Sequence, residues 1–321
     1  MNTVFEWLLD GDPWVVYGTH VHLLGQSVDA PEVRAARSDM LAHPLIRTLV
    51  SELQGWPGGI INSHKSAGTL LHKLTFAADI GLNVTDPGMS EVIEHILQHR
   101  DPLGPVQMLG NVSPHYGGSG EDTWGWALCD SPSILYALAR MGLADDPRVR
   151  QGIEHLAALV RGNGWPCAVS QELGTFRGPG RKDDPCPYAN LVMLKLLALM
   201  PDRRDGDAAR SGAEAILSAW ERRQEYHPYI FYMGNDFCKL KAPLVWYDIL
   251  HVTHVMAQFP WLRTDPRLLE MAALIRAKAD ADGRFTPESI WTAWKIWEFG
   301  QKKQPSRWLT LLVLNVLQQV P

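Results

Sequence analysis

Six apolar segments of similar pattern recur at similar intervals along this 321-residue chain, and this repetition is its most constraining feature. Each segment is apolar around most of its circumference, which indicates a helix buried on several sides. The segments are PWVVYGTHVHLLG from Pro13, SAGTLLHKLTFAADIGL from Ser66, SPSILYALARMGL from Ser131, PYANLVMLKLLALM from Pro187, WYDILHVTHVMAQF from Trp246 and SRWLTLLVLNVLQQV from Ser306. The repetition predicts an array of helices rather than a fold with a central sheet.

Most of these segments are followed by a loop and a second helix of amphipathic pattern, which is typical of an outer layer. The second helices are APEVRAARSDML from Ala30, DPGMSEVIEHILQH from Asp86, DPRVRQGIEHLAALV from Asp146, DGDAARSGAEAILSAW from Asp205 and DPRLLEMAALIRAKA from Asp265. An Asp before a Pro at the first helical position predicts a helix start, because the carboxylate accepts backbone N–H groups and Pro lacks one. The sequence therefore predicts pairs of helices, each with an inner and an outer member.

The two ends of the chain each carry one unpaired helix. VFEWLLDG at residues 4–11 has no helix before it, and the last inner helix, which ends near Val320, has none after it. Pairing the two would remove the apolar faces that an open array must cap. We therefore expect an all-α fold, an α/α toroid of about six helix-pair repeats closed by the N-terminal helix, as a single domain over residues 1–321. An open helical solenoid is the alternative.

Composition and charge exclude several classes of protein. The chain is 46% hydrophobic and 20% charged, which is typical of a globular protein, and its net charge of −5 gives no general attraction to nucleic acid or anionic membranes. No apolar stretch reaches the ~18–20 residues of a membrane span, and the N-terminus lacks a basic n-region. Four cysteines in a chain of this length do not indicate a disulfide scaffold. We expect a cytoplasmic protein without a nucleic-acid partner.

The cysteines gain meaning from the repeat, because loops that join an outer helix to the next inner helix lie at one mouth of a toroid. Cys129, Cys186 and Cys238 each precede an inner helix, and Cys167 begins the loop that Cys186 ends. Four thiolates, or three with an Asp or His, suit tetrahedral zinc. We therefore predict a zinc site at this mouth. The spacing contains no Cys-x-x-Cys pair, so four separate, partly buried thiols are the alternative.

Basic residues are expected at the same mouth, where the N-termini of the inner helices also point. Arg181 and Lys182 lie in one loop and Lys239 in the next. Together with the helix N-termini, they would favour a phosphate or diphosphate group. The alternative is that these loops carry charged residues only because they are exposed to solvent.

The lumen of such a toroid supplies the candidates for catalysis. Asp248 and His251 are three residues apart on one helical face, which suits an acid–base pair. Asp130 and Asp236 lie beside cysteines and are further candidate catalytic carboxylates, and Tyr188, Trp246 and Tyr247 are candidate substrate-binding aromatics. Ring faces can stabilise a carbocation formed from an isoprenoid. The alternative is that these aromatics are ordinary core residues.

The paired helices, several Gly-aromatic repeat ends such as Gly55-Trp56, WYDILHVTHV and KKQPSRWLTLLVLNVL resemble the bacterial prenyltransferase/squalene-cyclase-like toroids of the terpenoid cyclase and protein prenyltransferase superfamily. Squalene–hopene cyclases carry an Asp-x-Asp-Asp acid motif, and no such string occurs in this sequence. Protein prenyltransferase β subunits hold zinc through an Asp-x-Cys pair and a later His. Asp236-Phe237-Cys238 matches the pair, whereas Lys303-Gln304-Pro305-Ser306 stands where that His is expected.

Two functions follow from this resemblance and from the residues above. The first is an enzyme of prenyltransferase or terpene-cyclase type that acts on an isoprenoid or similar apolar substrate, with or without a diphosphate, in a central cavity, with zinc as its metal. The second is a non-catalytic toroid that binds an apolar ligand or a partner protein. A basic pocket at the lumen favours the enzyme, and a lumen filled by side chains favours the binder.

Overall fold

A computed structural model describes residues 3–61 and 63–321, and within them thirteen α-helices and one two-stranded sheet occur. The chain divides into two compact units. The terminal unit contains the described residues up to Val50 together with Gly234–Pro321, and the central unit contains Ser51–Met233. The single-domain toroid stays a prediction, and each unit is described by itself below.

The terminal unit combines helices from both ends of the chain. Its helices are α1 (Thr3–Leu9), α2 (Pro13–Gly18), α3 (Pro31–Ala42), most of α4 (Pro44–Leu53), α11 (Ile249–Met256), α12 (Pro266–Arg276) and α13 (Arg307–Gln319). A π-helical turn at Thr19–Leu23 extends α2 directly. The inner segments from Pro13, Trp246 and Ser306, and the outer segments from Ala30 and Asp265, are thus confirmed as helices.

The central unit holds the remaining helix pairs. Its helices are α5 (Leu70–Asp79), α6 (Met89–Gln98), α7 (Ser131–Leu138), α8 (Pro147–Ala158), α9 (Pro187–Leu197) and α10 (Asp207–Glu221). All residues of α7 and α9 are buried, whereas α8 buries one stripe that includes Val149 and Ile153. The distinction between inner helices and amphipathic outer helices is therefore confirmed.

A β-hairpin in the central unit was not expected from the sequence. Strand β1 (Met108–Asn111) pairs antiparallel with β2 (Asp122–Gly125), and Met108 lies opposite Gly125. The connection contains Gly117 and Gly120, both with positive φ, which allow the chain to reverse. These strands are too short to leave an alternating pattern in the sequence, so the hairpin could not be recognised there.

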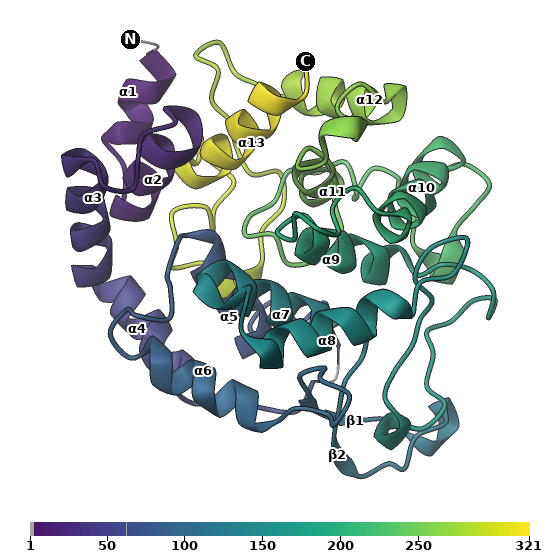
Figure 1. The fold of residues 1–321 in the computed structure, drawn as a ribbon. Helices are drawn as coiled ribbons and strands as arrows, with labels where there is room; N and C mark the ends of the chain where they lie inside the picture. Colours follow the sequence, from purple (N-terminus) through teal and green to yellow (C-terminus); the bar gives the residue numbers. More distant parts are fainter. Residues whose placement is uncertain (1–2, 62) are drawn as a thin grey trace. The chain divides into compact units, whose positions relative to one another are not determined.

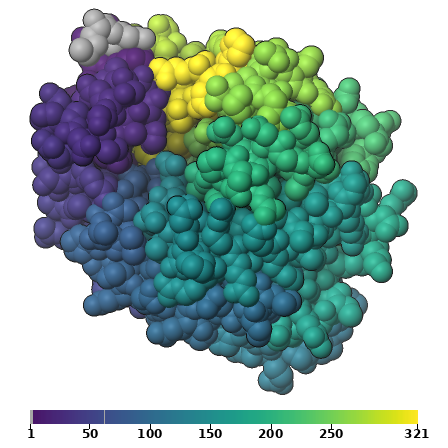
Figure 2. Space-filling model, viewed as in Figure 1, coloured from purple at the N-terminus to yellow at the C-terminus, as the bar shows by residue number. Residues whose placement is uncertain are grey.

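The predicted pairing of the first and last helices is confirmed within the terminal unit, where α1 contacts α13 (Figure 1). The Arg307 Nε donates a hydrogen bond to the Trp7 carbonyl at 2.9 Å, and the guanidinium carbon lies 4.9 Å from the centre of the Trp7 ring. Leu8 is fully buried. In the space-filling view, the purple N-terminal residues lie directly against the yellow C-terminal residues (Figure 2).

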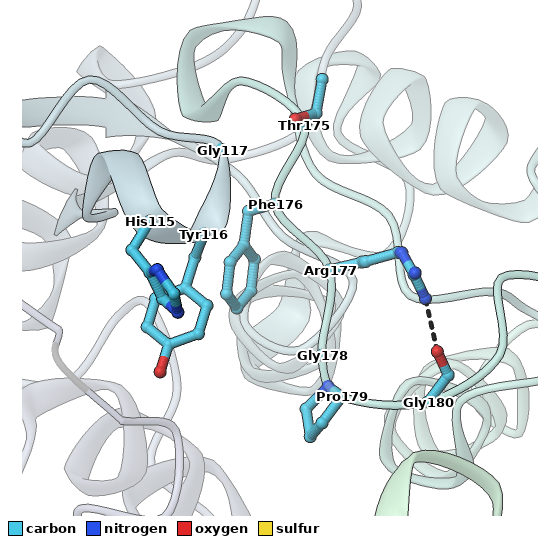
Figure 3. A pocket seen from close by; sticks show the side chains of 9 residues that line it. All are labelled: His115, Tyr116, Gly117, Thr175, Phe176, Arg177, Gly178, Pro179 and Gly180. Atoms are coloured by element: carbon cyan, nitrogen blue, oxygen red, sulfur yellow. Dashed lines mark hydrogen bonds between the residues drawn. The ribbon is translucent and has the colours of Figure 1, made fainter.

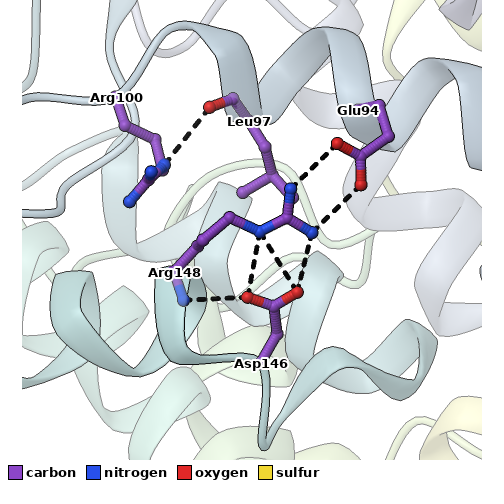
Figure 4. A network of polar contacts seen from close by, with 5 residues as sticks. All are labelled: Glu94, Leu97, Arg100, Asp146 and Arg148. Carbon is purple, nitrogen blue, oxygen red and sulfur yellow. Dashed lines mark hydrogen bonds and ion pairs between the residues drawn. The ribbon is translucent and has the colours of Figure 1, made fainter.

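Two outer helices begin with the Asp-Pro-Arg arrangement that the sequence predicts. Asp146 accepts a hydrogen bond from the Arg148 backbone N–H at 2.8 Å, and Asp265 accepts one from that of Arg267 at 2.9 Å. The Arg148 guanidinium also holds both carboxylate oxygens of Glu94, at 2.8 and 3.0 Å, and so fastens α8 to α6 (Figure 4). The N-cap hydrogen bonds of Asp146 and Asp265 each contribute about 1 kcal/mol to stability.

Within residues 3–61 and 63–321, each helix is too short or too polar to cross a bilayer. The cytoplasmic location stays a prediction.

Candidate active site

Asp248 lies at the N-terminus of α11 and is 1% exposed. Its Oδ1 accepts a hydrogen bond from the His251 backbone N–H at 2.9 Å, as expected of a residue that caps a helix. Its Oδ2 is buried and has no hydrogen-bond partner among the described residues. One carboxyl oxygen is thus fixed by the helix, and the other has no hydrogen-bond partner within residues 3–61 and 63–321.

The surroundings of Asp248 favour its protonated form. Burial raises its pKa from 3.8 to about 7, although the N–H groups of His251 and Leu250 and the charge of Lys241 act in the opposite direction. Desolvation raises the pKa of a carboxyl group because it disfavours the charged form. Near neutral pH, a large fraction of Asp248 is therefore a carboxylic acid, and a protonated Oδ2 can act as a general acid.

His251 is buried, and its ring is oriented by the backbone. Its Nδ1 lies 2.8 Å from the Trp246 carbonyl oxygen. Since a carbonyl only accepts hydrogen bonds, Nδ1 must carry the proton, and Nε2 of the neutral ring carries the lone pair. The predicted pair of Asp248 and His251 therefore lies together at the N-terminus of α11, and the roles of the two residues as acid and base stay a prediction.

Aromatic rings precede Asp248 in the chain. Trp246 and Tyr247 are partly exposed, and their ring centroids lie 6.2 Å apart in an edge-to-face arrangement. The Tyr247 ring also lies 5.5 Å from that of Phe237. Aromatic faces of this kind can stabilise a nearby cation. A substrate-binding role for Trp246 and Tyr247 stays a prediction.

Asp236 is part of an ion-pair cluster in the same unit. Its carboxylate is 68% exposed and contacts the Nζ atoms of Lys239 and Lys241, each at 3.2 Å. Burial raises the pKa of Asp236, but the hydrogen bonds from the two lysines outweigh it, so the net change is downward. Asp236 is therefore an ionised partner of Lys239 and Lys241, unlike Asp248.

The other predicted basic residues, Arg181 and Lys182, are exposed on a loop of the central unit. The Lys182 carbonyl accepts a hydrogen bond from Arg161 at 3.1 Å. The same irregular segment contributes to a pocket of about 530 Å³, lined by His115, Tyr116, Gly117 and residues 175–180 (Figure 3). Anion binding by Arg181 and Lys182 stays a prediction.

Three of the four cysteines belong to the central unit. A hydrogen bond with Cys186 and burial raise the pKa of the Cys129 thiol, and burial raises the pKa of the Cys167 thiol to about 11. Cys238 belongs to the terminal unit. Across residues 3–61 and 63–321, no group of three or more His, Cys, Asp or Glu side chains has the arrangement of a metal site. Zinc stays a prediction from the sequence.

Asp130 and Tyr188 lie beside these cysteines. Asp130 caps α7, where its Oδ1 accepts the Ala127 N–H at 2.8 Å and its Oδ2 lies 3.1 Å from His64 Nε2. Tyr188 is 1% exposed, and burial raises the pKa of its phenol. Both carboxylate oxygens of Asp130 are thus engaged, which distinguishes this residue from Asp248.

No protein-family model and no curated protein matches this chain. Among solved structures, a protein from Actinoplanes is 17% identical with a TM-score of 0.42, over 96% of this chain and 90% of that chain. The type II terpene cyclase MstE from Scytonema, without ligand, is 12% identical with a TM-score of 0.41, over 96% and 88%. A variant of MstE in complex with geranylgeranyl dihydroxybenzoate is 12% identical with a TM-score of 0.42, over 97% and 88%.

Sequence reasoning missed a buried polar cluster on the inner helices of the central unit. Lys195 on α9 pairs with Asp79 on α5, and the Tyr136 hydroxyl on α7 donates to Asp79 at 2.6 Å. The Lys195 Nζ also lies 4.4 Å from the centre of the Tyr136 ring. The signal was a lysine within the otherwise apolar PYANLVMLKLLALM, because buried lysines usually require a partner.

Proposed function

We propose that this chain is an enzyme that transfers a proton from Asp248 to the carbon–carbon double bond of an apolar, isoprenoid-type substrate. The observation that carries this proposal is the buried carboxyl group whose Oδ1 is held by α11 and whose Oδ2 has no hydrogen-bond partner among the described residues. An acid that is fixed at one oxygen and unsatisfied at the other is prepared to donate from the second. The sequence resemblance to terpenoid cyclases supplies the substrate class.

The reaction follows from the chemistry of these groups. A proton leaves Asp248 Oδ2, a carbon–hydrogen bond forms as the double bond breaks, and a carbocation remains with the Asp248 carboxylate. The faces of Trp246 and Tyr247 would stabilise this cation. Loss of a proton from a neighbouring carbon to a base, for which His251 Nε2 carries a lone pair, restores a double bond. Because one proton enters and one leaves, the product is an isomer of the substrate, cyclic or acyclic.

Incubation with isoprenoid probes in D2O tests the proposal. Geranylgeranyl dihydroxybenzoate, which one of the similar structures contains, is a suitable first probe, together with geranylgeranyl diphosphate. Mass spectrometry should find an isomeric product that carries deuterium, and Asp248→Asn should lower turnover by about 10²–10⁴-fold, the usual contribution of general acid catalysis. The matched control is Asp282→Asn, which removes an exposed carboxylate of the same unit.

The non-catalytic alternative gives a different result in the same experiment. Saturable binding of an isoprenoid probe without any product, at equal affinity in the wild type and Asp248→Asn, would support a binding protein and reject the acid role. Equal turnover in the wild type and Asp248→Asn would reject Asp248 as the acid even if the chain is an enzyme.

A further inference from the structure

A pocket of about 510 Å³ in the terminal unit is not used by the proposed acid chemistry. Trp7 of α1 and Leu45 of α4 line it, together with residues that precede α13, so the pocket lies beside the contact between the first and last helices. The charged residues in its wall are Asp12, Arg284, Glu298 and Arg307. Both signs of charge therefore line one concave surface.

The two basic residues of this pocket are held at one aromatic ring. The guanidinium carbons of Arg284 and Arg307 lie 4.7 and 4.9 Å from the centre of the Trp7 ring. Their carboxylate partners, Asp282 and Asp10, lie 3.5 and 3.4 Å away and are 65% and 88% exposed, so these ion pairs are weak. The Arg284 Nε has no hydrogen-bond partner among the described residues. Because two like charges share one ring, an anionic group of a ligand is favoured beside them.

Asp12 is the acidic residue of the pocket that is available to a ligand. It is partly exposed and occupies the N-cap position of α2, but its carboxylate makes no capping hydrogen bond to that helix. Burial raises the pKa of Asp12, whereas the charges of His43 and Arg307 act in the opposite direction. Burial also raises the pKa of Glu298, and the negative charge of Asp12 adds to this rise. Since the two carboxylates repel each other, an ammonium group of a ligand is favoured beside Asp12.

Glu298, by contrast, is engaged with the N-terminus of α13. Its Oε1 accepts hydrogen bonds from the Ser306 hydroxyl at 2.8 Å and the Trp308 N–H at 2.7 Å. Its Oε2 accepts one from the Arg307 N–H at 3.1 Å. The first N–H groups of α13 are thus already bound to a carboxylate of the protein. An anionic group of a ligand must therefore bind to the arginine side chains and not to the end of the helix.

We propose that this pocket binds a free α-amino acid with an apolar side chain. The carboxylate of the ligand binds to the guanidinium groups of Arg284 and Arg307, and its ammonium group binds to Asp12. Leu45 and Ile296 line the same pocket, and Ile296 is 71% exposed, so these two residues cover the apolar side chain of the ligand. A zwitterion pairs with both signs of charge at once, whereas a simple anion or a simple amine pairs with only one.

Isothermal titration calorimetry of the intact chain with L-leucine and L-phenylalanine tests this site. Leucinamide, which lacks the carboxylate, and 4-methylpentanoate, which lacks the ammonium group, should each bind about tenfold more weakly than leucine, or worse, because a hydrogen bond between charged groups is lost. Asp12→Asn and Arg284→Gln should weaken the binding of leucine by a similar factor. The matched controls are Asp29→Asn and Arg34→Gln, which alter exposed residues of the same unit and should bind leucine as the wild type does.

Thermal melting supplies a second measurement. Leucine should raise the melting temperature of the wild type, because a ligand that binds only the folded state stabilises it, and should not raise that of Asp12→Asn. The analogues test the charge requirement on the wild type alone, so the proposal can be rejected even if a variant fails to fold. Equal affinity for leucine and 4-methylpentanoate would indicate a simple anion site, and equal affinity for leucine and leucinamide an amine site. Either result, or no saturable binding of both amino acids at millimolar concentration, rejects the proposal.

Discussion

Lys195 Nζ lies 3.0 Å from Asp79 Oδ2, and the side chains of both residues are nearly buried, at 7% and 12% exposed. The Tyr136 hydroxyl completes the cluster by donating to the other carboxylate oxygen of Asp79. Burial alone would raise the pKa of Asp79, but the charges of Lys195 and Arg140 and these hydrogen bonds lower it. The cluster therefore fastens α5, α7 and α9 together through one carboxylate.

Removal of one partner from this pair should be far more costly than removal of both. Asp79→Leu leaves a buried ammonium group without its carboxylate, which typically costs about 3–5 kcal/mol. The double variant Asp79→Leu/Lys195→Met replaces the pair with apolar groups and should recover most of that loss. Urea denaturation of the three proteins measures both effects. A double variant less stable than Asp79→Leu would contradict this account.

The pKa of Asp248 predicts how stability depends on pH. The folded chain holds the Asp248 proton up to about pH 7, whereas the unfolded chain releases it near pH 3.8. Between these values folded Asp248 binds more protons than unfolded Asp248, so the contribution of this residue to the free energy of unfolding falls as pH rises from about 4 to about 7 and is then constant. At about 1.4 kcal/mol per pKa unit, the total loss is on the order of 4 kcal/mol.

Asp248→Asn should abolish this part of the pH dependence, because an amide does not titrate. Denaturant unfolding at pH 5 and pH 8 should show a smaller loss of stability in Asp248→Asn than in the wild type. Asp282→Asn, at an exposed position, should keep the wild-type slope. Parallel slopes in the wild type and Asp248→Asn would show that Asp248 is ionised throughout this range and cannot serve as the proposed acid.

The contact between the first and last helices should contribute strongly to stability. Leu8 is fully buried on α1, so Leu8→Ala should destabilise the chain by about 2–5 kcal/mol. Leu103→Ala, at a side chain that is 56% exposed, is the matched control and should change little. Deletion of residues 1–11 should lower the melting temperature further than Leu8→Ala. An unchanged melting temperature in the deletion variant would mean that α1 is dispensable.

Metal analysis of the purified protein tests the predicted zinc site. Zinc bound by Cys129, Cys167, Cys186 and Cys238 requires about one ion per chain, and chelation would then lower stability. Sub-stoichiometric zinc and no effect of chelators on stability would reject the zinc site. About one zinc per chain that is lost in Cys186→Ser would support the zinc site.

The sequence predicted the helices well because their signals are local. Segments that are apolar around most of their circumference predicted the inner helices, and Asp146 and Asp265, each followed by a proline, predicted the starts of outer helices. Both signals depend only on residues that are close in the sequence. The contact of α1 with α13 followed from the need to cover unpaired apolar faces. The β-hairpin at Met108–Gly125 lacked such a signal because its strands are short and its stability depends on surrounding packing.

The sites were less predictable because protonation and contact depend on three-dimensional surroundings. Asp248 could be chosen from its position on the helix, but neither its unsatisfied Oδ2 nor the rise in its pKa on burial can be read from the neighbouring residues in the sequence. The partners of Asp236 and Asp130 are likewise visible only in the structure. Spacing placed Cys129 and Cys186 near corresponding helix starts, but it did not show that the two thiols interact.

The division of the chain into units also has a consequence for biosynthesis. The central unit is continuous from Ser51 to Met233, so it can fold as soon as it has left the ribosome. The terminal unit cannot fold completely at that stage. Arg307 donates a hydrogen bond to the Trp7 carbonyl, 300 residues away, so α1 gains this contact only after α13 has been synthesised. During that interval the apolar side of α1, with Val4 and Leu8, lacks its final partner. A nascent chain stalled before α13 should therefore recruit chaperones through its first helices.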